Sequence, residues 1–230
     1  GRLRYAVTPR FAITSSKFQL EQASRLLSEY PEANGKKGVL LQTHLNENDE
    51  EINWVKELFP ESESYFGVYQ DFGITGANSV FGHCIHNTED EYQKMAETGS
   101  KISLCPRSNL FLGSGLFELE KLESYGIDVS LASDVGGGDS FSMFQVMNEA
   151  YKVCRMNDFN LDPVKAFYLT TLGAAQVLNM DDSIGNFECG KEADFIVVDL
   201  NATEIISTTN KISPSLPAVI YHHLTPPPPL

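Results

Sequence analysis

Cysteine and positive charge are both scarce in this chain of 230 residues. The four cysteines are Cys84, Cys105, Cys154 and Cys189, and their wide spacing forms no C-x-x-C pair. We therefore expect reduced thiols and a cytoplasmic location rather than a disulfide framework. Lysine and arginine number 17 against 31 aspartates and glutamates, which gives a formal net charge of −14. This balance, without a basic stripe, argues against broad nucleic-acid binding.

Long apolar runs and several common enzyme motifs are also missing. No run is long enough to cross a membrane, so no membrane interaction is expected. No Gly-rich phosphate loop follows the first predicted strand, and G-x-S-x-G is absent, so neither a dinucleotide fold nor a serine hydrolase is indicated. The start at Gly1 has neither an initiating Met nor signal-peptide anatomy, as expected of a chain cut from something longer.

What is present is a regular alternation of strand-like and helix-like segments. Apolar runs predict strands at 3–7, 39–43, 79–83, 101–105 and 127–132. Amphipathic spacing and start signals predict helices near 16–27, 49–59, 88–99, 115–125, 140–154 and 163–178. This alternation predicts parallel strands joined by crossover helices, hence either an α/β barrel or a doubly wound sheet.

Polar residues fall at the carboxyl ends of four predicted strands. Arg10, His44, His83 and Asp134 each follow or end a different apolar run. Barrel enzymes place their catalytic groups at these strand ends. This placement favours the barrel, although the doubly wound sheet remains open.

His44 and Glu47 form the first candidate pair for chemistry. A histidine at the end of a buried strand is a potential metal ligand, and a carboxylate three residues on can transfer protons. Taken alone, His44 would more often be a hydrogen-bonded core residue, and Glu47 an exposed carboxylate at a helix start. Together they favour a site that binds a metal and handles a proton.

His83 and Asp134 extend this candidate site. The segment His83-Cys84-Ile85-His86 has no second ligand pair nearby, so it does not indicate a zinc knuckle, and His86 is interpreted as a surface residue. Asp134 precedes Val135 and three glycines, a pattern that marks either a turn or a metal-binding carboxylate approached closely by backbone.

Arg10 and Phe11 combine a fork of hydrogen-bond donors with an aromatic face. Such a pair can recognise a flat polar heterocycle, with the arginine at its edge and the ring on its face. The alternative is an arginine that reaches solvent over a core phenylalanine. The pair alone does not decide between them.

These motifs resemble the guanine deaminases of the amidohydrolase superfamily, which are metal-dependent barrel hydrolases. The resemblance covers nearly the whole chain up to about Leu200. It rests on Thr8-Pro9-Arg10-Phe11, His44-Leu45-Asn46-Glu47-Asn48, Gly82-His83-Cys84, Cys105-Pro106-Arg107-Ser108-Asn109-Leu110, Ser133-Asp134-Val135-Gly136-Gly137-Gly138 and the segment from Ile184 to Asp194.

The resemblance implies hydrolytic deamination of guanine to xanthine and ammonia. His44 and Asp134 would bind the catalytic Zn²⁺, and Asp134 would also orient and deprotonate the attacking water. Glu47 would shuttle protons to the purine ring and the leaving ammonia. His83 would hydrogen-bond the attacking hydroxide and the substrate.

The family likeness also assigns the substrate site and the assembly. Arg10 and Phe11 would hold the guanine, with His44 and Asp134 beside it. Family members are commonly dimers, so a homodimer is expected of the whole protein. The alternatives are a superfamily member that acts on another amino- or chloro-substituted heterocycle, and a non-catalytic fragment or scaffold.

One departure from the family concerns the metal ligands. The family begins its barrel with a His-x-His pair, and no His-x-His occurs in this chain. By the family order, Arg10 follows the fourth strand, so we expect a partial (β/α)8 TIM barrel of about strands 4–8. Two protein ligands are too few for a tight zinc site, and we expect the chain alone to be inactive.

The expected domain division has three parts. Residues 1–183 are the partial barrel, and 184–200 begin a small flanking β-sandwich domain with a β-hairpin. Residues 201–230 are expected to form an irregular Pro-rich tail that ends in Pro226-Pro227-Pro228-Pro229.

Overall fold

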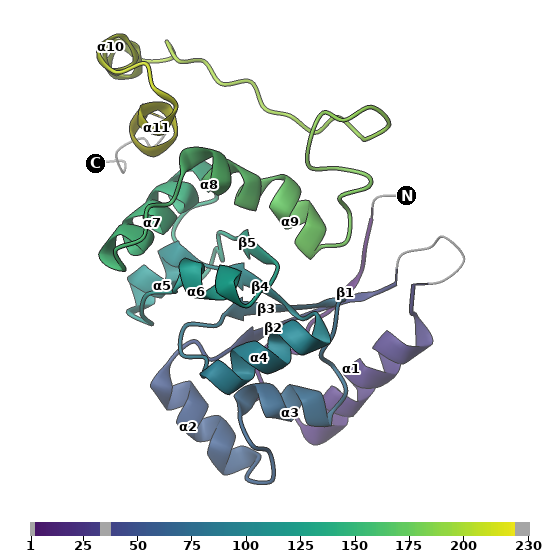
Figure 1. Ribbon diagram of the computed structural model, residues 1–230. Helices are drawn as coiled ribbons and strands as arrows, with labels where there is room; N and C mark the ends of the chain where they lie inside the picture. The colour runs from purple at the N-terminus through teal and green to yellow at the C-terminus, as the bar shows by residue number, and fades with distance from the viewer. Residues whose placement is uncertain (1–2, 33–37, 224–230) are drawn as a thin grey trace.

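The chain folds around one parallel sheet of five strands whose spatial order follows the sequence (Figure 1). The computed structural model describes residues 3–32 and 38–223. The strands are β1 Ala6–Val7, β2 Leu40–Leu45, β3 Ser79–His83, β4 Lys101–Leu104 and β5 Val129–Leu131. Every neighbouring pair is parallel, so all carboxyl ends lie at one edge of the sheet. This is the partial α/β barrel that the alternation predicts.

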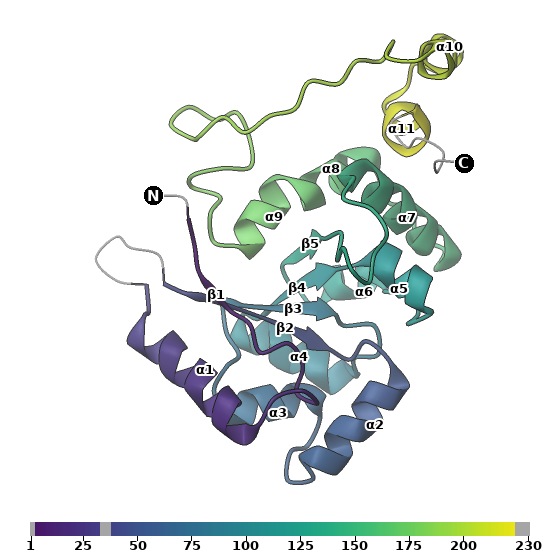
Figure 2. The same cartoon turned by 180° about the vertical axis from the view of Figure 1, so that it is seen from behind.

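Helices connect the strands and form two groups, one below the sheet and one above it in the view of Figure 1, and Figure 2 shows the same two groups from behind. Those before β5 are α1 Lys17–Glu29, α2 Asp49–Leu58, α3 Tyr65–Asp71, α4 Glu89–Thr98, α5 Pro106–Leu112 and α6 Leu119–Ser124. Those after it are α7 Met143–Met156, α8 Pro163–Thr170, α9 Leu172–Val177, α10 Glu204–Ile212, α11 Leu216–Ala218 and the π-helical turn η1 Val219–His223. Helix α1 packs on β1 and β2, whereas α7, α8 and α9 pack against β5.

Local sequence signals explain where several helices begin. The Ser16 side chain accepts from the Gln19 backbone N–H, and the Gln19 side chain bonds back, which forms a capping box at α1. Thr88 and Glu91 form the same motif at α4. Asp162 caps α8, where Pro163 occupies the first helical position.

The core lies between the sheet and its helices. Leu41, Phe81 and Ile102, from three adjacent strands, have no exposed surface, and they join one apolar cluster with Leu20 of α1 and Met95 of α4. Full burial of a side chain of this kind stabilises a fold by about 1.5–3 kcal/mol. The sheet is thereby fixed in the register that brings its carboxyl ends together.

The structure confirms the predicted strands but adds helices that the sequence pattern did not reveal. β3 spans the expected 79–83, while β1 and β5 are shorter than predicted. Helices α3 and α5 were not expected, and the helix predicted at 115–125 begins only at Leu119. The helix predicted at 163–178 is broken at Thr171, whose φ of −128° and ψ of −99° are not helical.

The predicted hairpin at 184–200 is wrong. This segment contains turns, bends and extended chain but no strand. The apolar run that suggested a strand is largely exposed, with Ile196 and Val197 at 71% and 87%. Strand pairing requires a partner strand, and no strand of the described residues pairs with this run.

The tail beyond Asn201 is helical rather than irregular up to its last described residue. Thr203 caps α10, and η1 packs against α7. The Tyr221 ring stacks on Tyr151 at a centroid distance of 4.5 Å, and its hydroxyl donates to the Leu161 carbonyl at 3.1 Å. These contacts hold the segment on the helical layer. The proline run at 226–229 lies outside the described residues.

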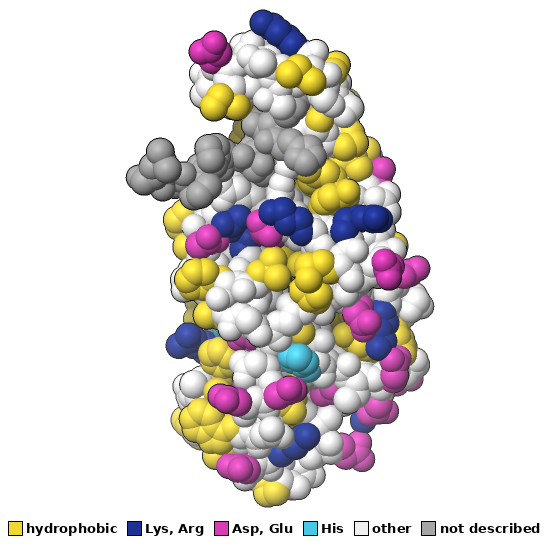
Figure 3. Space-filling view, turned by 90° about the vertical axis from the view of Figure 1, so that its left-hand side faces the viewer, with side chains coloured by type: hydrophobic (Ala, Val, Ile, Leu, Met, Phe, Trp, Pro, Cys, Tyr) yellow, Lys and Arg dark blue, Asp and Glu magenta, His cyan; other side chains and the backbone are white. Residues whose placement is uncertain are grey.

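The surface carries charges of both signs and several apolar patches (Figure 3). Large exposed apolar side chains include Trp54, Phe111 and Phe141. Among the described residues, none of the helices combines the length and apolar character that crossing a bilayer requires.

Candidate active site at the carboxyl edge of the sheet

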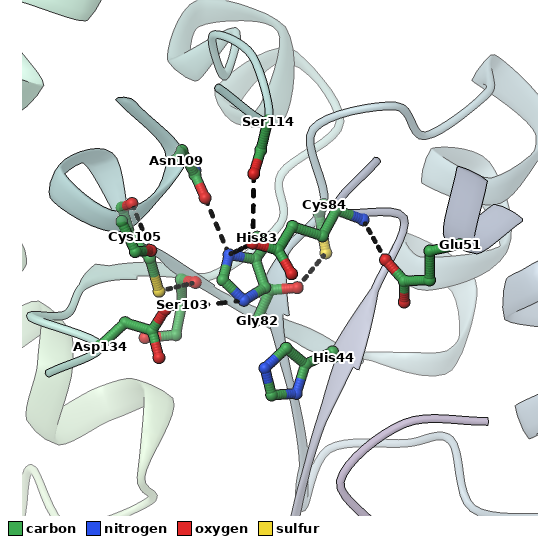
Figure 4. A network of polar contacts seen from close by, with 12 residues as sticks. His44, Glu51, Gly82, His83, Cys84, Ser103, Cys105, Asn109, Ser114 and Asp134 are labelled. Carbon is green, nitrogen blue, oxygen red and sulfur yellow. Dashed lines mark hydrogen bonds and ion pairs between the residues drawn. The ribbon is translucent and has the colours of Figure 1, made fainter. Parts of the chain in front are cut away.

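The predicted site residues meet at the carboxyl edge of the sheet. His44 is the second-to-last residue of β2, and His83 is the last residue of β3. The remaining candidates lie on loops that follow β1, β2 and β5: Arg10, Phe11, Glu47 and Asp134. Parallel pairing of β2 with β3 places Leu45 opposite His83, so the two histidines lie on neighbouring strands. Figure 4 shows His44, His83 and Asp134 gathered in one region.

His44 is held as a neutral imidazole with one free ring nitrogen. Its Nδ1 lies 2.7 Å from the Arg10 carbonyl oxygen, which can only accept, so Nδ1 carries the proton and Nε2 is left with a lone pair. Burial, and next the neighbouring His83, lower the pKa of His44 below its usual value. The Phe11 ring stacks on the imidazole at a centroid distance of 3.9 Å and fixes its plane. Metal-binding histidines are commonly oriented in this way.

His83 lies at the centre of the cluster and is 2% exposed. Its ring centroid is 4.9 Å from that of His44. Glu47 Oε1 is 3.8 Å from its Nδ1, and Asp134 Oδ2 is 4.0 Å from its Nε2. The two carboxyl groups that the sequence pointed out therefore approach opposite nitrogens of one imidazole.

Glu47 is buried on a loop that its neighbours fix. Its carboxylate accepts a hydrogen bond from Ser114 Oγ at 3.2 Å. Its backbone N–H donates to the carboxylate of Glu51 at 3.1 Å. Glu51 also accepts from the Tyr65 hydroxyl at 2.6 Å, and burial raises the pKa of Glu51. Glu47 is therefore not the exposed carboxylate at a helix start that one interpretation of the sequence allowed.

The glycines after Asp134 keep space beside its carboxylate. A Cβ atom on Gly137 would lie 3.0 Å from Asp134 Oδ2 and 3.3 Å from Ser108 Cβ. The Gly137 backbone N–H also donates to the Asp134 carbonyl at 3.1 Å. This arrangement agrees with the interpretation that the glycine run allows close backbone approach, and it also forms a turn.

Arg10 lies at the solvent side of the cluster. Its guanidinium carbon is 5.2 Å from the centroid of the Phe11 ring, which also stacks on the His44 imidazole. The pair therefore connects the outside of the site to a candidate metal ligand. Arg10 is exposed, as both interpretations of this pair allow.

Among the described residues, two sets of donor atoms could hold a metal ion. His44, Glu47 and His83 form one set, and His83, Cys105 and Asp134 form the other, with all donor atoms of a set within 4.8 Å. Imidazole nitrogens and carboxylate oxygens are donors that zinc takes. The sulfur of Cys105 is also a donor type that zinc takes, and burial raises the pKa of its thiol. The donor types fit zinc, although neither set includes both His44 and Asp134.

Two contacts at the site were missed by sequence reasoning. His86, expected at the surface, is half-buried, and its Nε2 donates to the Ser114 carbonyl at 2.8 Å. Asn109 is buried and bonds His83 through its Oδ1 at 2.8 Å. Asn109 lies in the segment Cys105 to Leu110, one of those that carry the family resemblance. Nothing in the local sequence indicates which strand end its side chain contacts.

A family model described as the amidohydrolase family matches residues 1–220. The chain belongs to the amidohydrolase family. It is 49% identical over 205 residues to the guanine deaminase of Escherichia coli strain K12, an alignment covering 89% of this chain and 45% of that protein. A solved structure of the E. coli enzyme superposes with a TM-score of 0.91 at 46% identity, covering 97% of this chain and 52% of that one.

A second solved structure contains a ligand. The guanine deaminase of C. acetobutylicum, with guanine bound in its active site, superposes with a TM-score of 0.81 at 29% identity and covers 94% of this chain and 50% of that one. The chain thus spans about half the length of the relatives it matches. The amidohydrolase family is generally metal-dependent.

Proposed function

We propose that the protein to which this chain belongs is a zinc-dependent guanine deaminase that converts guanine and water to xanthine and ammonia. The observation that carries the proposal is the placement of Glu47 and Asp134 on opposite nitrogens of His83, at 3.8 and 4.0 Å. Hydrolytic deamination needs one group to take a proton from water and another to give one to the leaving amine. The similarity to guanine deaminases supports guanine as the substrate.

The proposed roles are those that the resemblance to guanine deaminases implies. Asp134 would orient the attacking water and take its proton as the new C–O bond forms at the amine-bearing carbon. Glu47 would shuttle the protons that the water gives up to the purine ring and to the amine, so that the C–N bond breaks, ammonia leaves and a carbonyl group remains on the ring. His83 lies between these carboxyl groups and would hydrogen-bond the attacking oxygen.

His44 and Asp134 would hold the zinc, which when bound supplies a Lewis acid that activates water. The bare Nε2 of His44 and the half-exposed carboxylate of Asp134 fit this role. Two ligands are fewer than the three or four of usual zinc sites. We expect the remaining histidine ligands to come from a His-x-His strand outside this chain.

Arg10 and Phe11 would bind guanine at the open side of the site. The guanidinium offers several donors to the acceptor atoms of a purine edge. The Phe11 ring would limit how the purine lies relative to His44, on which it stacks. A cytoplasmic location and a homodimeric assembly of the whole protein belong to the same proposal.

The test uses the full-length protein that contains this chain. Zinc content is measured by mass spectrometry, and xanthine and ammonia are quantified with guanine as substrate. Glu47→Gln should abolish turnover while zinc stays bound, since the amide cannot transfer the proton. Glu57→Gln, on the exposed surface of α2, is the matched control and should leave turnover unchanged.

A substrate panel tests the assignment to guanine. Adenine, cytosine and an amino- or chloro-substituted triazine should be converted far more slowly than guanine. A preference for another heterocycle would replace guanine within the same hydrolase class. Absence of turnover with every substrate, in protein that carries zinc, would contradict a catalytic function.

A further inference from the structure

Helix α5 and the turn after it contribute two buried polar side chains to the site. Asn109 is 1% exposed, and its Oδ1 lies 2.8 Å from Nδ1 of His83. Ser114 is 8% exposed, and its hydroxyl donates to Oε1 of Glu47 at 3.2 Å. Both contacts reach the proton-handling pair rather than the two residues assigned to zinc. Figure 4 shows Asn109 and Ser114 approaching from the same side.

The Asn109 contact selects one tautomer of His83. A carboxamide oxygen only accepts, so His83 Nδ1 carries the proton and Nε2 presents its lone pair. Nε2 is the nitrogen that faces Asp134. His83 is thereby prepared to accept a hydrogen bond from a water molecule beside Asp134.

The Ser114 contact orients Glu47. The hydroxyl occupies Oε1, the same oxygen that lies 3.8 Å from His83, so it restrains rotation of the carboxylate. A carboxylate that transfers protons between two places must return to one geometry, and a single well-placed donor favours that geometry.

The backbone around Ser114 is itself fixed. The Ser114 N–H donates to the Asn109 carbonyl at 2.8 Å, and the Ser114 carbonyl accepts from His86 Nε2 at 2.8 Å. Gly115 has φ of +134°, and a Cβ there would lie 2.8 Å from Ile85 Cγ2. The turn therefore packs directly on the loop that follows His83, the last residue of β3.

Asn109 bonds His83 through its carboxamide oxygen, while its carboxamide nitrogen is left unpaired among the described residues. Its Nδ2 is buried and has no hydrogen-bond partner within the described part of the chain. Buried polar groups of a purely structural residue are normally paired. The unpaired amide indicates that the carboxamide is placed for the histidine rather than for the fold.

We propose that Asn109 and Ser114 are positioning residues that act through His83 and Glu47 and serve proton transfer rather than metal binding. The proposal rests on the proposed deaminase function. Loss of either contact would misplace a proton-transfer group while leaving the zinc ligands and the substrate contacts in place.

The experiment compares Asn109→Ala, Ser114→Ala and Ser114→Thr in the full-length protein. The two alanine variants should lower kcat by roughly 10- to 100-fold, the range seen when partners that orient site residues are removed. KM for guanine should stay within about threefold and zinc content should be unchanged, because neither contact binds metal or purine. Ser114→Thr retains the hydroxyl and should recover most of kcat.

The control is Ser79→Ala. Ser79 is 2% exposed, lies at the amino end of β3, and donates to the Ile74 carbonyl at 2.8 Å. The Ser79→Ala substitution therefore removes a buried hydroxyl at the opposite end of β3 from His83. It should lower thermal stability without changing kcat. Unchanged kcat in Ser114→Ala and Asn109→Ala, or loss of zinc in parallel with activity, would overturn the proposal.

A second measurement does not depend on turnover. Histidine ¹⁵N chemical shifts distinguish the two neutral tautomers, and the His83 signal is assigned by its loss in His83→Asn. His83 should appear as the Nδ1–H form and should become a tautomer mixture in Asn109→Ala. If the wild-type protein does not deaminate guanine, the proposed function fails. The tautomer then decides the inference separately, and an Nε2–H form would refute it.

Discussion

Several residues at the carboxyl edge of the sheet have backbone conformations that non-glycine residues seldom adopt. His83, Cys84 and Asp134 have φ of +69°, +52° and +45°, and Asn46, beside Glu47, has φ of +49°. Non-glycine residues with positive φ are uncommon, and they persist where surrounding contacts determine the backbone. At Asn46 those contacts are bonds from its side chain to Asn87 and Glu91. Four of the six non-glycine residues with positive φ in the described part of the chain therefore lie at the carboxyl edge of the sheet, and the other two are Asp158 and Asn179.

Gly137→Ala tests the space beside Asp134. The new methyl group would lie 3.0 Å from Oδ2 of Asp134, so the carboxylate must move. We expect kcat/KM of the full-length enzyme to fall by roughly tenfold or more, because small misplacement of a catalytic group is costly. Gly67→Ala in α3, where the nearest atom is the flexible Ser64 hydroxyl, is the control. Equal activity in both variants would show that Asp134 tolerates displacement.

Glu51 predicts a pH-dependent stability. Burial raises its folded pKa above 4.5, so the folded state binds more protons than the unfolded state between those two values. Its contribution is therefore most favourable below pH 4.5 and declines as pH rises through the raised folded pKa. Glu51→Gln removes the titration, so urea unfolding from pH 4.5 to 7 should show the variant gaining on the wild type as pH rises. A constant difference would contradict this.

At the scale of elements, caps and prolines decide where helices begin. The Asp162 side chain accepts from the backbone N–H groups of Val164 and Lys165, at 2.8 and 3.4 Å. Asp162→Ala should lower the free energy of unfolding by about 1 kcal/mol, with no effect on kcat, because α8 does not reach the site. Glu21→Ala, an exposed carboxylate inside α1, is the control. Urea denaturation measures both.

Most strands could be predicted from the sequence because each contains neighbouring apolar residues, such as Val80 and Phe81 in β3, where every residue is buried. The same rule failed for 195–198, since an apolar run forms a strand only beside a partner. Asn109 and Ser114 could not be predicted as site residues, because their contacts join positions 26 and 67 apart in sequence. Polar residues at strand ends can be recognised in the sequence as candidates for a barrel site. The residues that hold them in place cannot, because their contacts depend on tertiary packing.

At the scale of the whole molecule, the sheet of the described residues is open. β1 and β5 are its outer strands, and each pairs on one side only. Unpaired strand edges and exposed apolar side chains such as Phe111 and Phe141 favour association with another polypeptide segment. A barrel closes such edges, and the metal ligands that this chain lacks are expected on the strands that would close it.

The isolated chain should therefore behave differently from the full-length protein. We expect it to bind less than one zinc per molecule, to show no guanine turnover and to aggregate, because two metal ligands and an open sheet leave both the site and the core incomplete. Adding the preceding part of the full-length protein as a separate polypeptide should restore zinc binding and monodispersity together, because the same strands supply both. Size-exclusion chromatography and zinc analysis of the two preparations measure this. A monodisperse isolated chain with one tightly bound zinc would show instead that these residues complete the site alone.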